Sequence, residues 1–124
     1  MTSPFLAVAP ESWVACNGLA FAIRDAFPVS PGHTLIIPRR LVSNYFEATE
    51  EEQQAMFRLA GDVKRQLDQL LPKPDAYNLG INAGAAAGQT VLHLHLHLIP
   101  RYNGDVADPR GGVRWVVPGK AAYW

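Results

Sequence analysis

This chain of 124 residues has a single cysteine, no formal net charge and no long apolar run. Its single cysteine, Cys16, cannot form an internal disulfide, which argues against a disulfide-stapled secreted domain and favours a reducing compartment. Eleven basic residues balance eleven acidic ones, so the chain lacks the basic excess typical of proteins that bind nucleic acid polymers. It also lacks the run of about 18 apolar residues that a membrane-spanning helix needs, and the basic start of a secretory signal. We therefore expect a cytoplasmic protein that binds neither membranes nor nucleic acid polymers.

The remaining composition is that of an ordinary folded domain. With 124 residues, 48% of them apolar, the chain suits one compact domain over residues 1–124. Residues 13–18 and 19–25 read as two strands, and the dipeptide Asn17-Gly18 between them favours a hairpin with a type I′ turn. Residues 33–38 are apolar and β-branched, which predicts a third strand near the centre of a sheet.

One long amphipathic helix is predicted in the middle of the chain. Thr49, followed three residues later by Glu52, forms a capping box at its start, and Pro72 ends it. Upstream, residues 39–46 are expected to form only a short helical turn. Apolar residues recur at helical spacing and predict a buried stripe: Met56, Leu59, Val63, Leu67 and Leu70.

Further strands are predicted after the helix. Residues 76–82 form one, a loop of small residues follows over 83–90, and residues 93–99 return as its hairpin partner. Residues 113–117 offer a last strand-like piece. Short links between strands indicate an antiparallel sheet with the long helix on one face, which is an α+β fold.

Three of the four histidines fall within five residues of the predicted strand 93–99. His93, His95 and His97 alternate with leucines, so on a strand the imidazoles would share one face and the leucines the other. The leucine face can join a core. The histidine face carries the side chain that titrates, binds metals and attacks electrophiles near neutral pH, so we look for function there.

Three interpretations of the histidines compete. Neighbouring pairs, about 6.7 Å apart at Cα, could bind a metal ion, whereas His93 and His97, roughly 13 Å apart, could hardly share one. Alternatively, the middle histidine is a nucleophile whose second ring nitrogen donates its proton to a fixed acceptor. The third interpretation is purely structural. The preceding loop supports the nucleophile, because the main-chain N–H groups around Gly88 and the side chains of Gln89 and Thr90 could bind an anion beside the histidines.

The sequence resembles the histidine triad (HIT) family. The segment His93-Leu-His-Leu-His-Leu-Ile99 matches the family's alternation of histidine and apolar residues. Leu19–Asp25, Pro31–Pro38, Asn82 and Gly88–His93 also follow in the expected order. The resemblance covers roughly residues 13 to 101, and it implies an antiparallel five-stranded sheet with one long and one short helix, usually paired into a homodimer.

The resemblance also implies chemistry at the α-phosphorus of a nucleotide. His95 corresponds to the nucleophile that forms a covalent nucleotidyl-histidine intermediate, His97 contacts the phosphate, and His93 and His33 lie in the hydrogen-bond relay behind them. Substrates of the family include nucleoside phosphoramidates and (di)nucleoside polyphosphates. No firmly bound cofactor is expected, although Mg²⁺ could accompany the substrate's phosphates.

Binding residues are implied in the same way. The phosphate-binding positions correspond to Asn82, Gly88, Gln89 and Thr90. Asp25 would hold the ribose hydroxyls, and Phe21 and Ile23 could enclose the base. Downstream, Arg101, Arg110 and Arg114 would suit a polyphosphate chain or a second nucleotide. Two other classes of function stay open: a metal-binding or metal-dependent protein that uses two of the histidines, and a nucleotide-binding module without catalysis.

Overall fold

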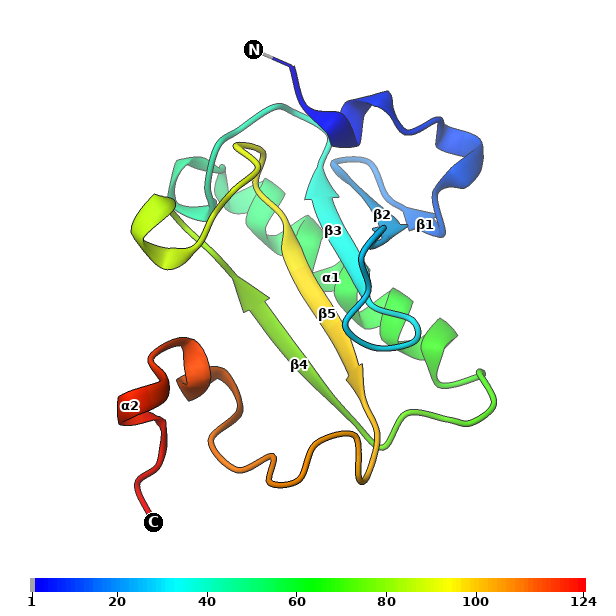
Figure 1. The fold of residues 1–124 in the computed structure, drawn as a ribbon. Helices are drawn as coiled ribbons and strands as arrows, with labels where there is room; N and C mark the ends of the chain where they lie inside the picture. The colour runs from blue at the N-terminus through cyan, green and yellow to red at the C-terminus, as the bar shows by residue number, and fades with distance from the viewer. Residues whose placement is uncertain (1) are drawn as a thin grey trace.

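A five-stranded antiparallel sheet with one long helix behind it forms the body of the protein (Figure 1). The computed structural model describes residues 2–124. In the sheet the strands lie in the order β1-β2-β3-β5-β4, so the predicted α+β class and the central third strand are confirmed. The strands are β1 (Ala15–Cys16), β2 (Ala20–Arg24), β3 (Thr34–Pro38), β4 (Ala76–Ile81) and β5 (Leu96–Arg101). The helices are α1 (Glu50–Leu67) and α2 (Pro118–Ala121), with 3₁₀ turns η1 (Pro4–Ala7), η2 (Pro10–Ser12), η3 (Tyr45–Glu47), η4 (Ala85–Ala87) and η5 (Gly112–Val116).

Helix α1 begins where the capping box predicts. The Glu52 N–H donates to Thr49 Oγ1 at 3.1 Å, and the Thr49 N–H donates to Glu52 Oε1 at 2.9 Å. The apolar stripe is buried as far as Leu67, but the prediction that it includes Leu70 was wrong. After Leu67 the chain tightens into i→i−3 hydrogen bonds, which turn Leu70 outward and leave it 40% exposed. The helical turn predicted over residues 39–46 forms only at its end, as η3.

The first hairpin forms with a different turn from the predicted one. β1 and β2 pair antiparallel, but neither Asn17 nor Gly18 has the positive φ that a type I′ turn requires. Instead the Asn17 side chain accepts the N–H groups of Leu19 and Ala20 at 3.1 and 2.9 Å. A side chain therefore takes the part that the prediction assigned to backbone conformation.

The C-terminal segment is helical rather than extended. The strand predicted over residues 113–117 was wrong, because most of this stretch belongs to η5 and packs beside β4 without joining the sheet. Arg114 donates to the carbonyls of Lys120 and Ala121 at 3.0 and 2.9 Å, which curls the segment onto itself. In Figure 1 it lies in orange and red beside β4.

Each face of the sheet has its own apolar cluster. The cluster toward α1 contains the leucines of the histidine segment: Leu94, Leu96 and Leu98. The opposite face carries a smaller cluster: Phe5, Phe21, Ile23, Leu35 and Ile37. The face away from α1 also holds the histidines, and it faces the viewer in Figure 1.

No helix in residues 2–124 combines the length and apolar character needed to cross a membrane.

Candidate active site

The three clustered histidines do not share one strand, contrary to the prediction. β5 begins at Leu96, so only His97 lies in the sheet, where it pairs with Leu35. Upstream the chain leaves the ladder, and the Leu94 N–H donates to the Val42 carbonyl at 2.8 Å. The leucines still alternate into the core toward α1, which confirms that part of the pattern. His93 and His95 are therefore held by contacts outside the sheet.

His93 is fully buried, and both of its ring nitrogens have partners. Nε2 lies 2.8 Å from the Pro38 carbonyl, and Nδ1 lies 2.7 Å from Ser3 Oγ. A carbonyl can only accept, so Nε2 carries the proton and Nδ1 accepts from the serine hydroxyl. Burial lowers the pKa of His93, and its hydrogen bonds to main-chain carbonyls oppose the shift. The ring is therefore a neutral, fixed part of the structure.

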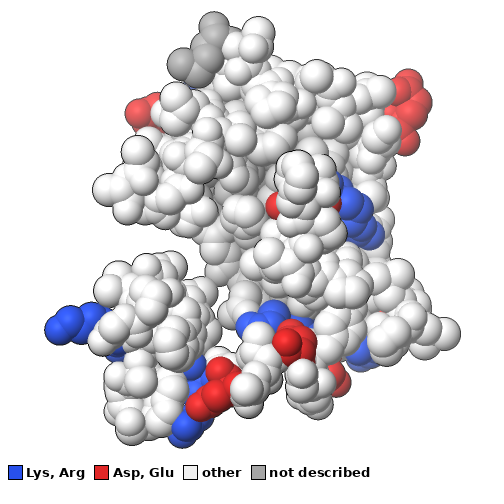
Figure 2. All heavy atoms as spheres, viewed as in Figure 1, with Lys and Arg blue, Asp and Glu red and all other residues white. Residues whose placement is uncertain are grey.

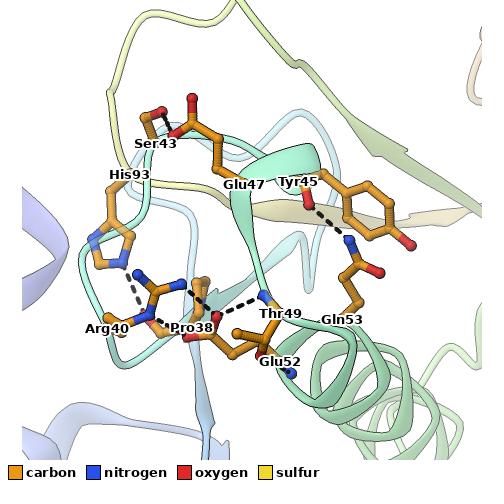
Figure 3. A network of polar contacts seen from close by, with 9 residues as sticks. All are labelled: Pro38, Arg40, Ser43, Tyr45, Glu47, Thr49, Glu52, Gln53 and His93. Atoms are coloured by element: carbon orange, nitrogen blue, oxygen red, sulfur yellow. Dashed lines mark hydrogen bonds and ion pairs between the residues drawn. The ribbon is translucent and has the colours of Figure 1, made fainter.

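The loop that follows Pro38, the last residue of β3, is tied to the start of α1 (Figure 3). Arg40 donates to both carboxylate oxygens of Glu52 at 3.0 and 2.7 Å, and the same carboxylate caps the helix through Thr49. Hydrogen bonds from Arg40 hold the pKa of the buried Glu52 below its usual range. One carboxylate thus links the helix to the loop that directly follows the carbonyl bound by His93.

His95 has one nitrogen committed and one free. Nδ1 lies 2.8 Å from the His93 carbonyl, which can only accept, so Nδ1 carries the proton and Nε2 keeps its lone pair. Within residues 2–124 no hydrogen bond to Nε2 is present. The Phe5 ring meets the imidazole edge-on, 5.1 Å between centroids. The half-buried ring is therefore held in the tautomer that a nucleophilic imidazole needs.

A second chain of hydrogen bonds orients His97. The Val29 N–H donates to His33 Nδ1 at 3.2 Å, so His33 carries its proton on Nε2. That nitrogen lies 2.9 Å from His97 Nδ1 and 3.4 Å from Asp25 Oδ2. The His33 Nε2–H therefore donates to His97 Nδ1, the nearer of the two acceptors, and the proton of His97 is on Nε2. Burial is the main cause that lowers the pKa of His97 to about 4, with His95 and His33 adding to it, so the ring is neutral at pH 7.

A cavity of about 510 Å³ brings most of the predicted site residues together. Among residues 2–124, its ionisable lining residues are Asp25, His95 and His97, without lysine or arginine. The Asp25 carboxylate accepts the Phe27 N–H at 2.8 Å and is mostly buried. The predicted residues that line the cavity are Ile23, Asp25, Asn82, Gly88, Thr90, His95 and His97.

Two predicted binding residues lie elsewhere. Phe21 is 1% exposed and stacks on Trp13 at 4.6 Å between centroids, so it belongs to the core and does not reach the cavity. The Gln89 side chain is buried and fully used: its amide donates to the carbonyls of Ser43 and Val91, and its oxygen accepts the Gly84 N–H. Gln89 therefore shapes the loop and has no group left for a phosphate in this conformation.

Several residues at the site were missed by the sequence reasoning. Pro4, Phe5 and Val8 come from the N-terminal segment and line the cavity, as does the highly exposed Phe27. Ser3 contacts His93 from the same segment. Nothing in the spacing of these residues links them to histidines about 65 to 90 positions further along the chain, so only the folded structure brings them to the site.

A second cavity of about 360 Å³ lies on the other side of His97, between the sheet and the C-terminal segment. Its lining includes Asn78, Asn82, His33 and apolar residues of β4 and β5, and no lysine or arginine of residues 2–124. The arginines expected to bind phosphate are already paired: Arg101 with Asp105 and Asn78, Arg110 with Asp108, and Arg114 with two carbonyls. Figure 2 shows basic and acidic atoms side by side on this segment.

Asp25, His33 and His97 are the one group in residues 2–124 that could bring three metal ligands together, within 4.8 Å of one another. The donor chemistry opposes a metal ion there. His33 Nδ1 accepts the Val29 N–H, so a metal on Nε2 would force a proton onto Nδ1, facing that N–H. Both nitrogens of His93 are also engaged. The trio fits a hydrogen-bond chain better than a metal centre.

A family model described as HIT domain matches residues 7–104. The chain belongs to the HIT family. This confirms the resemblance found in the sequence. Among solved structures, a zinc-bound HIT protein from Mycobacterium smegmatis superposes with a TM-score of 0.78 at 32% identity, covering 87% of this chain and 81% of that one. A HIT protein from Bacillus subtilis gives a TM-score of 0.75 at 30% identity, covering 85% and 77%.

Two of the proteins with similar sequences illustrate what is known of the relatives. An uncharacterised 16.1 kDa HIT-like protein of Mycoplasma pneumoniae is 44% identical over 86 residues, which are 69% of this chain and 59% of that protein. The AP-4-A phosphorylase of Mycobacterium tuberculosis is 32% identical over 93 residues, 74% of this chain and 47% of the enzyme. The chain thus spans about half to three fifths of the length of these relatives.

Proposed function

We propose that this HIT protein is a nucleotide hydrolase or transferase that acts at the α-phosphorus of a nucleoside phosphoramidate or a (di)nucleoside polyphosphate. The observation that carries the proposal is the tautomer of His95, whose Nδ1–H is committed to the His93 carbonyl while Nε2 keeps its lone pair beside the cavity. The name of the M. tuberculosis relative supports a nucleotide substrate.

The nucleoside would occupy the cavity of about 510 Å³. Its apolar wall, formed by Phe5, Val8 and Ile23, suits a base, and the Asp25 carboxylate has lone pairs left to accept the ribose hydroxyls. Asn82 and Thr90 line the same cavity as His95, so a phosphate bound between them would lie near Nε2.

The reaction would proceed in two displacements. His95 Nε2 attacks phosphorus, the bond from phosphorus to the leaving oxygen or nitrogen breaks, and its electron pair stays with the leaving group. The His95 imidazole becomes positively charged, and the His93 carbonyl stabilises it through Nδ1–H. Water or another acceptor then attacks phosphorus, and the bond to Nε2 breaks.

Two groups could assist these steps. A neutral His97 with its proton on Nε2 would donate to a phosphate oxygen, while His33 keeps that tautomer in place. The Thr90 hydroxyl could give its proton to the leaving group in the first displacement and regain one from the attacking water in the second. Because no lysine or arginine of residues 2–124 lines either cavity at His97, Mg²⁺ chelated by the substrate would supply the positive charge that a polyphosphate needs.

A homodimer is proposed for the same chain. β4 is an edge strand whose outer hydrogen-bonding groups have no strand partner in residues 2–124. Leu79 on this strand and Phe57 on α1 are 43% and 45% exposed and line one shared hollow. An unpaired edge with apolar neighbours suits association with a second copy.

Replacement of His95 tests the catalytic proposal. His95→Ala should lower turnover of adenosine phosphoramidate or diadenosine polyphosphate by at least about a thousandfold, because no nucleophile remains. The affinity for AMP should change only a few-fold. Rapid acid quenching of the unaltered protein, followed by peptide mass spectrometry, should find the nucleotidyl group on His95.

Other outcomes would select another function. An adduct on a different residue, or full turnover by His95→Ala, contradicts the proposed nucleophile. Turnover abolished by chelation even for a substrate with one phosphate would favour a metal-dependent hydrolase. AMP binding without turnover of any substrate, tested with and without Mg²⁺, would favour a binding module.

A further inference from the structure

The N-terminal segment, residues 2–12, lies against the histidine face of the sheet (blue in Figure 1). Phe5 joins the apolar cluster of this face and contacts both His93 and His95, with ring centroids 5.8 and 5.1 Å apart. The HIT-domain match begins only at residue 7. Ser3 and Phe5 therefore precede the part of the chain that the family model describes, yet they touch the histidines inside it.

Ser3 is the partner of the His93 nitrogen that carries no proton. Its hydroxyl oxygen accepts the Phe5 N–H at 3.2 Å, and it lies 2.7 Å from His93 Nδ1. Because His93 Nε2–H is committed to the Pro38 carbonyl, Nδ1 can only accept and the serine O–H must donate to it. Both residues are buried, so no bulk water can replace the hydroxyl.

The orientation of His93 matters because the sheet does not hold it. β5 begins three residues later, at Leu96, so no ladder hydrogen bond fixes the His93 carbonyl. That carbonyl is the acceptor for His95 Nδ1–H. The ring of His93, clamped by Ser3 on one side and by Pro38 on the other, is therefore the nearest rigid support for the tautomer of His95.

We propose that Ser3 is a positioning residue for the reaction: its hydroxyl locks the ring of His93 and so keeps the His93 carbonyl aimed at His95 Nδ1. The proposal rests on the function proposed above for His95. Ser3 does not line the nucleotide cavity, so its removal should change kcat and leave KM nearly unchanged.

The test compares Ser3→Ala, Ser3→Thr and the control Ser12→Ala, which makes the same change at an exposed serine of the same segment. Ser3→Ala should lower kcat between about 10-fold and 100-fold with KM within about twofold, because a misaligned nucleophile reacts slowly. Ser3→Thr keeps the hydroxyl and should recover most of kcat. Ser12→Ala should behave like the unaltered protein.

Imidazole ¹⁵N spectra give a second readout that needs no activity. The unaltered protein should have His93 protonated at Nε2 and His95 at Nδ1, and Ser3→Ala should shift His93 Nδ1 and mix the tautomers of His95. A His93 protonated at Nδ1 in the unaltered protein overturns the proposal, even if Ser3→Ala fails to fold. So does a folded Ser3→Ala variant with unchanged kcat, provided that His95→Ala is inactive. An active His95→Ala would instead overturn the proposed nucleophile.

Discussion

At the scale of single residues, identical side chains differ because their hydrogen-bond partners differ. Both ring nitrogens of His93 are hydrogen-bonded, whereas His95 has one nitrogen bound to a carbonyl. His97 is hydrogen-bonded through Nδ1 to the ring of His33. Each partner is a group whose donor or acceptor character is known, or is set by the next partner, so the tautomers follow from geometry. Only His95 is left with a free basic nitrogen beside the cavity in residues 2–124.

Burial of three histidines predicts how the free energy of unfolding depends on pH. The pKa of His97 is about 4 in the folded protein against 6.5 for an unperturbed histidine, so below pH 6.5 the unfolded chain binds more protons. The pKa values of His33 and His93 are shifted in the same direction by burial. The free energy of unfolding should therefore fall as the pH is lowered from 7 to 5.

Urea denaturation at pH 7, 6 and 5 measures this dependence. His97→Gln removes one titrating group and should flatten the decline, whatever it does to stability at pH 7. The window lies above the unperturbed pKa values of the carboxyl groups, so they contribute little to it. An equally steep decline in His97→Gln would show that His97 does not carry the effect.

At the scale of elements, α1 illustrates a boundary written in local sequence. Thr49 and Glu52 satisfy each other's main-chain N–H groups, which is why the helix starts where their spacing predicts. Glu52 also binds Arg40 and so ties the loop after β3 to the helix. Helix α1, behind the sheet, thereby anchors the loop that follows Pro38, whose carbonyl accepts the His93 Nε2–H.

Removal of the cap should cost stability in a graded way. Thr49→Ala loses the acceptor for the Glu52 N–H and should lower the free energy of unfolding by about 1 kcal/mol. Glu52→Ala should cost more, because it removes the reciprocal cap and the buried partner of Arg40 together. Urea midpoints measure both changes. Glu51→Ala, at an exposed position of the same turn, serves as the control and should stay within about 0.5 kcal/mol of the unaltered protein. Equal effects for Thr49→Ala and Glu51→Ala would contradict the role of the cap.

At the scale of the whole molecule, the open edge at β4 predicts a dimer. Sedimentation should give roughly twice the 13.6 kDa mass of the chain. Phe57→Glu places a charge beside Leu79 in the apolar hollow and should yield a folded monomer. Leu71→Glu makes a similar change at a residue that is 95% exposed in the loop after α1, and should leave the dimer intact. A monomeric unaltered protein, or equal effects of the two substitutions, would contradict an interface at this edge.

The local sequence by itself determined the start of α1, the central strand and the alternation of leucines beneath the histidines. Capping and periodicity depend on residues two to four positions apart, so they can be read without the fold. The family motif likewise lies within one short segment.

Only the tertiary structure decided which side chains meet. Ser3 contacts His93 from 90 positions away, and Phe21 stacks on Trp13. The Gln89 amide donates to carbonyls of its own loop and of a neighbouring loop. The tertiary structure also decided that β5 begins after His95, because the pairing with β3 starts at Leu96. His93 and His95 are therefore held by side-chain contacts and not by the sheet. The sequence therefore determined which residue types are present for the chemistry, whereas burial and hydrogen-bond partners, which depend on distant segments, decided which nitrogen of each histidine is free to react.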